Sequence, residues 1–386
     1  MRVLYDHQAF TLQDFGGVSR YHHELLCHAN WQSELAVALS NNLYLRDRQH
    51  SRHRTFLPES SLPARWRVIR YFNQRASRRA LQRGNFDVFH PTLADDDYFL
   101  ELLPADRPLV VTIHDMIPAL FPEHYPDRDG AVLNRIVQRA TRIIAVSEHT
   151  RADLLRLLPV APEKVRVVHH GYTEREFTTT AGPALPVPER YVLFTGSRAL
   201  YKNFGVLAEA LALLPAAIAQ DLHLVCAGGG PFTAAERELL ARTGWTGRAH
   251  QFGPVTDAQL NQLYQHAQAF IFPSEYEGFG LPILEAYGQQ CPVVLSEASC
   301  FPEIARDAAL YFPAAQPAAL AEQLARILTD SALRRDLIRL GQLRLLDFTW
   351  QHTARRTRAV YDEACQNTNL HPLPAQSDPL IPALEL

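Results

Sequence analysis

The segment from Ser274 to Glu285 holds the residues best suited to chemistry. It reads Ser-Glu-Tyr-Glu-Gly-Phe-Gly-Leu-Pro-Ile-Leu-Glu and follows an apolar run, Ala269–Phe272, that is typical of a buried strand. Pro282 suits the first turn of a helix, where its missing N–H costs nothing. Loop amides and a helix N-terminus together bind anions, and a diphosphate is such an anion. We expect Glu277 in the loop and Glu285 in the first helical turn to reach the same ligand; the alternative is a glycine turn with two solvated glutamates.

Positive charge near this anion site is predicted from Arg198 and Lys202, which follow the apolar run Tyr191–Thr195. The chain has 38 lysines and arginines together, and only Lys164 and Lys202 are lysines. Because arginine is used almost everywhere else, a lysine here is a candidate functional residue. A departing diphosphate gains negative charge, which a nearby cation stabilises. The alternative is a surface lysine at a helix start.

The first half of the chain also places polar residues or glycines after apolar runs. His114 ends the run Leu109–His114, and Gly16 and Gly17 follow the run Arg2–Tyr5. Ligands bind at the carboxyl ends of strands in open parallel sheets. We therefore expect His114 to hydrogen-bond a ligand and the two glycines to let phosphate or acceptor approach closely. The alternatives are a satisfied polar residue and a plain tight turn.

Two further residues are weaker candidates for binding an acceptor. Asp14 lies beside the two glycines and could orient a hydroxyl group. Ser147 follows a strand-like run and suits the N-cap of the next helix. A contact with the acceptor is predicted for both.

Twelve short apolar runs alternate with amphipathic helical patterns, which indicates βαβ units and parallel sheets. The runs are Arg2–Tyr5, Leu35–Leu39, Val88–His90, Leu109–His114, Ile143–Val146, Val165–His169, Tyr191–Thr195, Leu222–Ala227, Ala249–Phe252, Ala269–Phe272, Pro292–Leu295 and Ala309–Phe312. The fold class predicted is α/β, with two Rossmann-like doubly wound domains that face each other across a cleft. The divisions expected are a first domain at 1–177, a linker at 178–189, a donor-binding domain at 190–348, helices at 349–365 that pack back on the first domain, and a tail at 366–386. A G-x-G-x-x-G fingerprint does not follow the first run, which argues against a dinucleotide enzyme.

These motifs resemble glycosyltransferase family 4. Its members carry E-G-F-G-L-P-x-x-E followed by alanine, as in Glu277 to Ala286. The similarity extends from Met1 to about Ala364, through the segments Gly16–Tyr21, Gly196–Asn203, Ala227–Pro231, Gly253–Leu260 and Pro302–Ile304. The start of the chain is similar to bacterial members, many of them mannosyltransferases that build O-antigens and other polysaccharides.

The resemblance implies a GT-B architecture, a nucleotide-diphosphate sugar as donor substrate, retention of anomeric configuration, and no metal or other cofactor. The catalytic residues that it implies are His114, Arg198, Lys202 and Glu277. The donor-binding residues that it implies are Gly16, Gly17, Arg198, Lys202, Gly253, Val255, Glu277, Gly278, Phe279, Gly280, Leu281 and Glu285. Glu285 would bind the ribose, and the segment from Gly253 to Val255 would lie near the base. Members commonly have glycine where this chain has Gln290, which predicts a different helix closure or modest strain.

The bulk composition indicates where the protein acts. A formal net charge of −3 gives no general reason to expect nucleic acid. The five cysteines are scattered and form no pairing or ligand pattern, which is typical of reduced cytosolic thiols. We see neither a signal peptide nor an apolar stretch long enough to cross a bilayer, so we expect a cytoplasmic protein.

One basic segment, Arg46–Arg83, contains eleven arginines with interleaved aromatic residues. Such a segment can lie on an anionic membrane surface, here the inner face of the plasma membrane. The alternative is a solvated basic face, or one paired with acidic patches elsewhere.

The function predicted is transfer of a hexose, mannose from GDP-mannose, to a saccharide or lipid-linked saccharide in polysaccharide assembly. A nucleotide-sugar epimerase of the same architecture is one alternative, and would convert donor without acceptor. A non-catalytic carbohydrate-binding protein is another. It would tolerate loss of Lys202 or Glu285.

Overall fold

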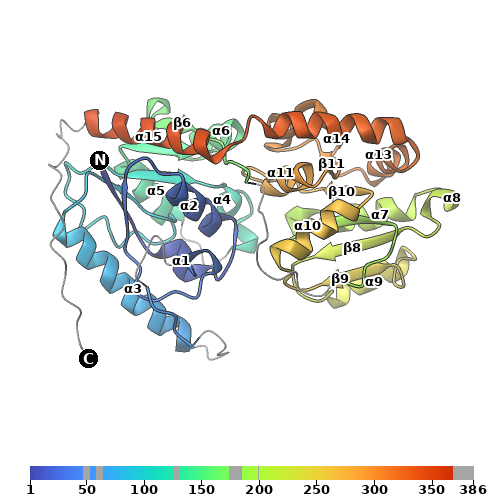
Figure 1. The fold of residues 1–386 in the computed structure, drawn as a ribbon, viewed down its shortest axis with the longest axis horizontal. Helices are drawn as coiled ribbons and strands as arrows, with labels where there is room; N and C mark the ends of the chain where they lie inside the picture. Colours follow the sequence, from blue (N-terminus) through green and yellow to red (C-terminus); the bar gives the residue numbers. More distant parts are fainter. Residues whose placement is uncertain (47–52, 58–63, 126–129, 174–184, 199, 368–386) are drawn as a thin grey trace.

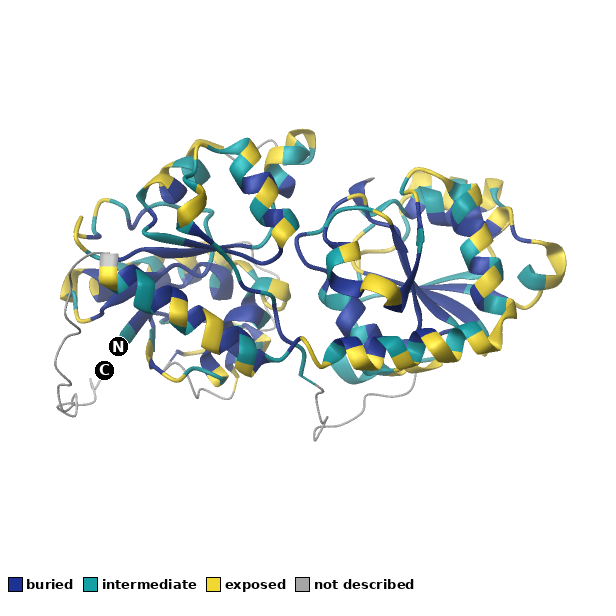
Figure 2. Ribbon diagram, turned by 90° about the horizontal axis from the view of Figure 1, so that it is seen from above, coloured by how far each residue is buried: buried dark blue, intermediate teal, exposed yellow. Residues whose placement is uncertain are grey.

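The computed structural model describes residues 1–46, 53–57, 64–125, 130–173, 185–198 and 200–367. Two α/β domains lie side by side, as the apolar runs predict (Figure 1). The strands of each sheet are buried, while the covering helices alternate buried and exposed residues (Figure 2). This pattern is that of parallel sheets covered on both faces.

The first domain contains six parallel strands. Two three-stranded sheets, with orders β2-β1-β3 and β4-β5-β6, are joined by a parallel bridge between Phe89 and Leu109. Its elements are β1 (Arg2–Tyr5), α1 (Gln8–Leu12), α2 (Gly17–Cys27), β2 (Gln32–Leu35), α3 (Ala64–Arg83), β3 (Val88–His90), β4 (Val110–Ile113), α4 (Ile117–Leu120), α5 (Gly130–Arg139), β5 (Arg142–Ala145), α6 (Glu148–Leu157) and β6 (Val165–Val167).

The second domain has one six-stranded parallel sheet of order β12-β11-β10-β7-β8-β9. Its elements are β7 (Tyr191–Thr195), a 3-10 turn η4 (Leu200–Lys202), α7 (Phe204–Ala212), α8 (Ala216–Ala219), β8 (His223–Ala227), α9 (Ala234–Arg242), β9 (Ala249–Phe252), α10 (Asp257–His266), β10 (Ala269–Phe272), α11 (Leu281–Gly288), β11 (Val293–Ser296), α12 (Phe301–Ala305), β12 (Ala309–Phe312), α13 (Pro317–Thr329) and α14 (Ser331–Leu345).

The chain crosses between the domains twice, and the two crossings lie side by side. The N–H of Tyr172 donates to the carbonyl of Phe348 at 2.9 Å. Gly171 permits this approach, since a Cβ there would lie 2.3 Å from the backbone nitrogen of Trp350. After the second crossing α15 (Trp350–Asn367) runs along the first domain (Figure 1) and contacts α2, β3, β4 and β5.

Eleven of the twelve apolar runs coincide with strands to within a few residues, but the run Leu35–Leu39 does not. The strand there is β2, and only Leu35 is common to both. Leu35, Ala36 and Val37 are buried in the core, yet the next amides, of Ala38 and Leu39, donate to the Asn73 side chain at 2.9 and 2.8 Å. The strand was predicted too far along the chain because these residues are buried without pairing to a neighbouring strand. An apolar run indicates burial, not strand pairing. Most of the predicted linker, much of the Arg46–Arg83 segment before α3 and the tail after 367 lie outside the described residues.

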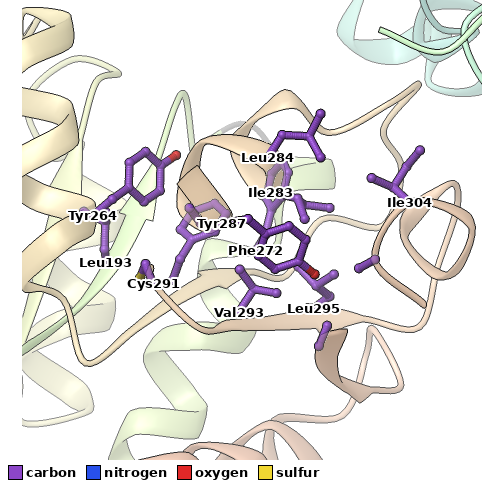
Figure 3. Packing of buried hydrophobic residues seen from close by; sticks show 14 of the residues in the cluster. Leu193, Tyr264, Phe272, Ile283, Leu284, Tyr287, Cys291, Val293, Leu295 and Ile304 are labelled. Carbon is purple, nitrogen blue, oxygen red and sulfur yellow. The ribbon is translucent and has the colours of Figure 1, made fainter. Parts of the chain in front are cut away.

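The core behind α11 sets the position of the loop before it. Phe272, Ile283 and Val293 pack between the strands and this helix (Figure 3). Tyr287 and Leu284 extend the same cluster. Burying side chains of this size stabilises the fold by roughly 1.5–3 kcal/mol each. The loop is therefore held between a buried strand and a buried helix.

Gln290 shows how α11 closes. Its φ is +56°, and the N–H of Cys291 donates to the carbonyl of Ala286 at 2.8 Å, so the chain keeps a left-handed closure. The expectation of a different closure was wrong, and the expectation of strain is supported, because a side chain in this region costs roughly 1 kcal/mol.

Replacing Gln290 with glycine should relieve this strain. We expect Gln290→Gly to raise the free energy of unfolding by about 0.5–1 kcal/mol, and Gln290→Val to lower it by about 1 kcal/mol or more. Urea unfolding measures both. The neighbouring Gln289 has φ −98°, so Gln289→Gly should bring no gain. Equal effects at both positions would contradict the interpretation.

Candidate functional site

The order of the second sheet defines its switch point. β8 pairs with one side of β7 and β10 with the other. Ligands in doubly wound sheets bind outside the carboxyl ends of strands at such a reversal. The segment after β7 contains Arg198 and Lys202, and the segment after β10 contains Glu277. The strand order therefore brings together residues that lie 75 positions apart.

Lys202 and Glu277 form an ion pair between Nζ and Oε1. Only 14 % and 13 % of these side chains is exposed. The hydroxyl of Ser274 donates to the same carboxylate at 2.8 Å, and the N–H of Glu277 donates to Ser299 Oγ at 3.0 Å. The structure thus places a partly buried cation and a held carboxylate at the switch point.

The loop between Glu277 and α11 has the shape that an anion site needs. Gly280 caps the helix with φ +88°, a conformation that favours glycine. Within the described residues, the amide N–H groups of Gly278, Phe279 and Gly280 have no hydrogen-bond acceptor. The Phe279 side chain is buried against the His170 ring at 4.7 Å, so its backbone alone faces a ligand.

Glu285 does not lie in the first helical turn, as expected, but is the fifth residue of α11. Its carboxylate forms an ion pair with Arg20 Nη1 and accepts from the Tyr264 hydroxyl at 3.3 Å. Arg20 belongs to α2 of the first domain. Glu285 therefore reaches across to the other domain.

Other contacts also join the two domains at this loop. A Cβ on Gly278 would lie 1.6 Å from the carbonyl oxygen of His114, and one on Gly17 would lie 3.9 Å from Leu281 Cδ1. Ser147 Oγ donates to the carbonyl of Gly278 at 2.7 Å and also caps α6. The structure thus brings His114, Gly17 and Ser147 against the loop that follows Glu277.

The His114 ring is suited to donate a hydrogen bond without carrying charge. Burial lowers its pKa to about 4, so the ring is neutral at physiological pH. Its Nε2 atom is buried and has no hydrogen-bond partner in the described part of the chain. The ring stacks on His170, with centroids 5.5 Å apart.

Arg198 is positioned differently from Lys202. Its Nε donates to Glu236 at 2.8 Å and its Nη2 to the carbonyl of Gly230 at 2.6 Å, with the guanidinium over the Phe232 ring. Only 4 % of its side chain is exposed. A contact between Arg198 and a diphosphate stays a prediction, and the structure shows this residue holding the glycine loop at 228–231.

Gly253 and Val255 lie between β9 and α10, and Val255 packs on the core. A small cavity that is open to solvent lies between the domains. Its lining is Arg20, Tyr172, Thr173, Asp257, Leu260, Asn261 and Glu285. Asp14 lies elsewhere, mostly exposed and 3.4 Å from Arg65 Nη2.

Two polar residues at this interface were missed as functional candidates. Arg20 occurs in a segment quoted for the resemblance, but nothing in the sequence indicates a partner 265 residues away. Glu303 accepts from His169 at 2.6 Å and from the amides of Glu148 and His149 at 3.0 and 3.3 Å. Burial alone would raise the pKa of Glu303, but these hydrogen bonds lower it below its usual value. The negative charge therefore persists at the N-terminus of α6, which it stabilises.

Among the described residues, no group of three or more His, Cys, Asp or Glu side chains is arranged to hold a metal ion. None of the described helices is both long and apolar enough to span a bilayer.

Comparisons with known proteins agree with this geometry. Residues 15–175 match the family described as Glycosyltransferase Family 4, and residues 178–344 match Glycosyl transferases group 1. O-antigen chain mannosyltransferase B of Escherichia coli is 29 % identical over 270 residues, which are 65 % of this chain and 69 % of the relative. D-inositol 3-phosphate glycosyltransferase of Salinispora arenicola is 30 % identical over 324 residues, 75 % of this chain and 70 % of the relative. The crystal structure of Anabaena HepE in complex with UDP and glucose superposes with a TM-score of 0.70 at 18 % identity, covering 94 % of this chain and 99 % of that one.

Two facing Rossmann-like domains with a site between them define a glycosyltransferase of the GT-B fold. Within this class the chain belongs to glycosyltransferase family 4, and it resembles the O-antigen mannosyltransferases.

The contact between Gly278 and His114 makes a direct prediction. A methyl group at Gly278 cannot fit 1.6 Å from a carbonyl oxygen, so Gly278→Ala should force the domains or the loop apart by an ångström or more. We expect transferase activity to fall about 10²-fold or more, since such misplacement removes the alignment of reacting groups. Initial rates at saturating donor measure the loss.

Gly205→Ala is the matched control, because its Cβ would meet only Leu239 Cδ2 at 4.0 Å. Its activity and melting temperature should match those of the parent. Full activity of Gly278→Ala would show that this arrangement is not the catalytic one.

Proposed function

We propose that this glycosyltransferase is a retaining, metal-independent enzyme that transfers mannose from GDP-mannose to a saccharide or lipid-linked saccharide of a cell-surface polysaccharide. The observation that carries the site assignment is the Lys202–Glu277 pair beside amides without acceptors, at the switch point and facing His114. Mannose is supported by the similarity to O-antigen chain mannosyltransferase B.

In this mechanism the positive charge comes from the protein. Lys202 and the amides of Gly278, Phe279 and Gly280 face the donor diphosphate and stabilise the charge that develops as it departs. Neutral His114 donates a hydrogen bond to the transferred sugar. Glu285 accepts from the ribose hydroxyls. Activity that persists in excess EDTA is the expected result.

Retention is proposed to proceed by attack on the same face of the sugar. The bond from C1 to the phosphate oxygen breaks, the acceptor oxygen bonds to C1, and the acceptor proton moves to the departing phosphate. Glu277 is engaged by Lys202 and Ser274, and Asp115 accepts from the N–H of Ile117 at 2.9 Å, which reduces the nucleophilicity of both carboxylates and favours the same-face route. A glycosyl adduct trapped on Glu277 or Asp115 would overturn this step.

The donor is tested by thermal shift with GDP, UDP, ADP and dTDP and their sugars. A ligand that binds only the native state at 100 times its Kd adds about 2.7 kcal/mol of stability. We expect the largest shift with GDP and GDP-mannose. Incubation of that donor alone should give only slow hydrolysis, whereas full conversion would identify an epimerase.

The outward face of α3 supports peripheral attachment to an anionic membrane. Arg67, Tyr71, Arg75 and Arg79 follow one another at intervals of one helical turn and are accessible, with Phe72 beside them. The structure, over its described residues, gives these three arginines no carboxylate partner. Cationic and aromatic side chains on one helix face suit the headgroup region of a bilayer.

Co-sedimentation with phosphatidylglycerol vesicles tests this attachment. Each arginine contributes about 1 kcal/mol near such a surface, so removing all three should weaken binding by about two orders of magnitude at low salt. The control removes three exposed arginines of the second domain: Arg242, Arg335 and Arg339. Equal binding of the two triple variants, or no binding of the parent, would exclude the α3 surface.

A further inference from the structure

Arg20 is a residue of the first domain whose side chain contacts the proposed donor site of the second domain. It lies in the first turns of α2, directly after the Gly16-Gly17 turn, and its Nη1 pairs with the Glu285 carboxylate. Both side chains are largely buried, at 13 % and 16 % exposure. Both line the solvent-open cavity between the domains.

The guanidinium is not fully satisfied by this pair. Its Nε is buried and has no hydrogen-bond acceptor among the residues that the structure describes. A buried donor without an acceptor lowers the stability of the fold, especially on a charged group. Such a group in a native structure therefore calls for a specific explanation. We expect the missing acceptor to belong to a ligand at the solvent-open cavity that Arg20 lines, outside the described residues.

The chemistry of the surroundings identifies that acceptor. The cavity lining also contains the carboxylates of Asp257 and Glu285, which suit the hydroxyl groups of a nucleoside. Among the described residues of the lining Arg20 is the one cation, and it lies in the first turn of the eleven-residue helix α2. A planar guanidinium can donate two parallel hydrogen bonds to phosphate oxygens. The N-terminus of a helix also favours the negative charge of a phosphate.

We propose that Arg20 is a donor-binding residue, which donates to the diphosphate of the nucleotide from the first domain while Glu285 holds its ribose from the second. The nucleotide thereby contacts residues of both domains. The ion pair seen here marks the position that Arg20 takes when the domains meet. This inference rests on the proposed function, because it assumes a nucleoside diphosphate in the cavity.

Isothermal titration of the full chain with a nucleoside diphosphate and with the matching nucleoside tests the assignment. The probe is whichever of GDP, UDP or ADP binds the parent most tightly, with its free nucleoside. Arg20→Ala and Arg20→Gln should weaken diphosphate binding about tenfold or more, the loss expected for a charge-assisted hydrogen bond. Binding of the nucleoside should change less than twofold, and Arg20→Lys should recover part of the diphosphate affinity.

Arg156→Ala is the matched control. This arginine forms an ion pair with Asp153 along α6 and lies outside the cavity lining, so its removal should leave both affinities unchanged. An equal loss of affinity for the diphosphate and for the nucleoside would mean that Arg20 only holds the two domains together, and it would overturn the proposal. Unchanged diphosphate affinity in both Arg20→Ala and Arg20→Gln would overturn it as well. A parent protein that binds none of the nucleotides would instead refute the proposed function, and this inference with it.

Discussion

Replacing Lys202 with alanine is expected to lower kcat by about 10²- to 10³-fold, the usual loss when one stabiliser of transition-state charge is removed. Lys202 Nζ is the cation paired with Glu277 at the switch point, where the donor diphosphate is proposed to lie. Because its side chain is largely shielded from water, its charge acts at low effective dielectric. Initial rates at saturating donor and acceptor measure the change.

The same variant should lose stability, because Glu277 keeps a partly buried charge without its partner. Lys202→Ala combined with Glu277→Gln removes that charge and should recover much of the melting temperature. It should not recover turnover. Restored activity in the double variant would mean that Lys202 serves only to balance Glu277.

Lys164 provides the matched control, since it is the other lysine of the chain. It lies at the end of a short 3-10 turn, and its Nζ donates to the carbonyl of Gln138 at 3.1 Å, in an exposed place. Lys164→Ala should leave kcat and stability unchanged. Comparing the two variants thus separates the specific effect of removing Lys202 from the general effect of removing a lysine.

Mildly acid pH is expected to destabilise the protein strongly, because four histidine rings lie in contact with one another in the first domain. His22, His90 and His170 are buried, and His114 lies above them with ring centroids 5.4 to 6.1 Å apart along the chain of contacts His90–His22–His114–His170. They come from α2 and from the ends of β3, β4 and β6. Tertiary folding therefore gathers four imidazoles that the sequence keeps far apart.

Burial lowers the pKa of all four rings. The pKa of His90 falls to about 3 and that of His114 to about 4, while those of His22 and His170 fall well below 6.5. The folded rings stay neutral where the unfolded rings take up protons, so the cost to stability is absent above pH 7 and grows as the pH falls through 6.5. Each ring costs about 1.4 kcal/mol for every pH unit below 6.5 and little above it, so the four rings amount to about 5 kcal/mol between pH 7.5 and 5.5.

Urea unfolding across this pH range measures the effect. The pKa of Glu303 is lowered from its usual 4.5 by its hydrogen bonds, so its contribution is lost only at more acid pH, below this range. A single replacement such as His90→Gln should remove about a quarter of the pH dependence that the four rings cause. A free energy of unfolding that stays constant from pH 7.5 to 5.5 would show that these rings are not shielded as the structure indicates.

Local patterns predicted most of the fold because burial and periodicity are local properties. Each parallel strand is buried on both faces, so Tyr191–Thr195 and Ala269–Phe272 were recognised to the residue. β2 was misplaced because the apolar residues after Leu35 are buried while their amides bond to Asn73 instead of a strand. Glu285 was placed in the first turn, but it is the fifth residue of α11, because the helix already begins at Leu281, before Pro282.

The candidate site, too, could be predicted from the sequence only in part. The Glu277–Glu285 segment, Lys202 and His114 could be recognised because each follows a strand, and the ends of parallel strands lie at one edge of a sheet. The pairing of Lys202 with Glu277 depends on the order β10-β7-β8, which no local pattern contains. Arg198 was predicted beside Lys202, but its side chain turns to Glu236, since rotamer and partner are decided by neighbours in space.

The sequence alone determined that this chain builds two parallel-sheet domains, where most of the strands lie, and which residue types follow them. Only the tertiary structure decided which of these ends face each other. It placed Arg20 against Glu285, Gly278 against His114, and Glu303 on the N-terminus of α6. The physical reason is that strand and helix formation depend on neighbours along the chain, whereas contacts across the cleft depend on how two separately packed cores dock.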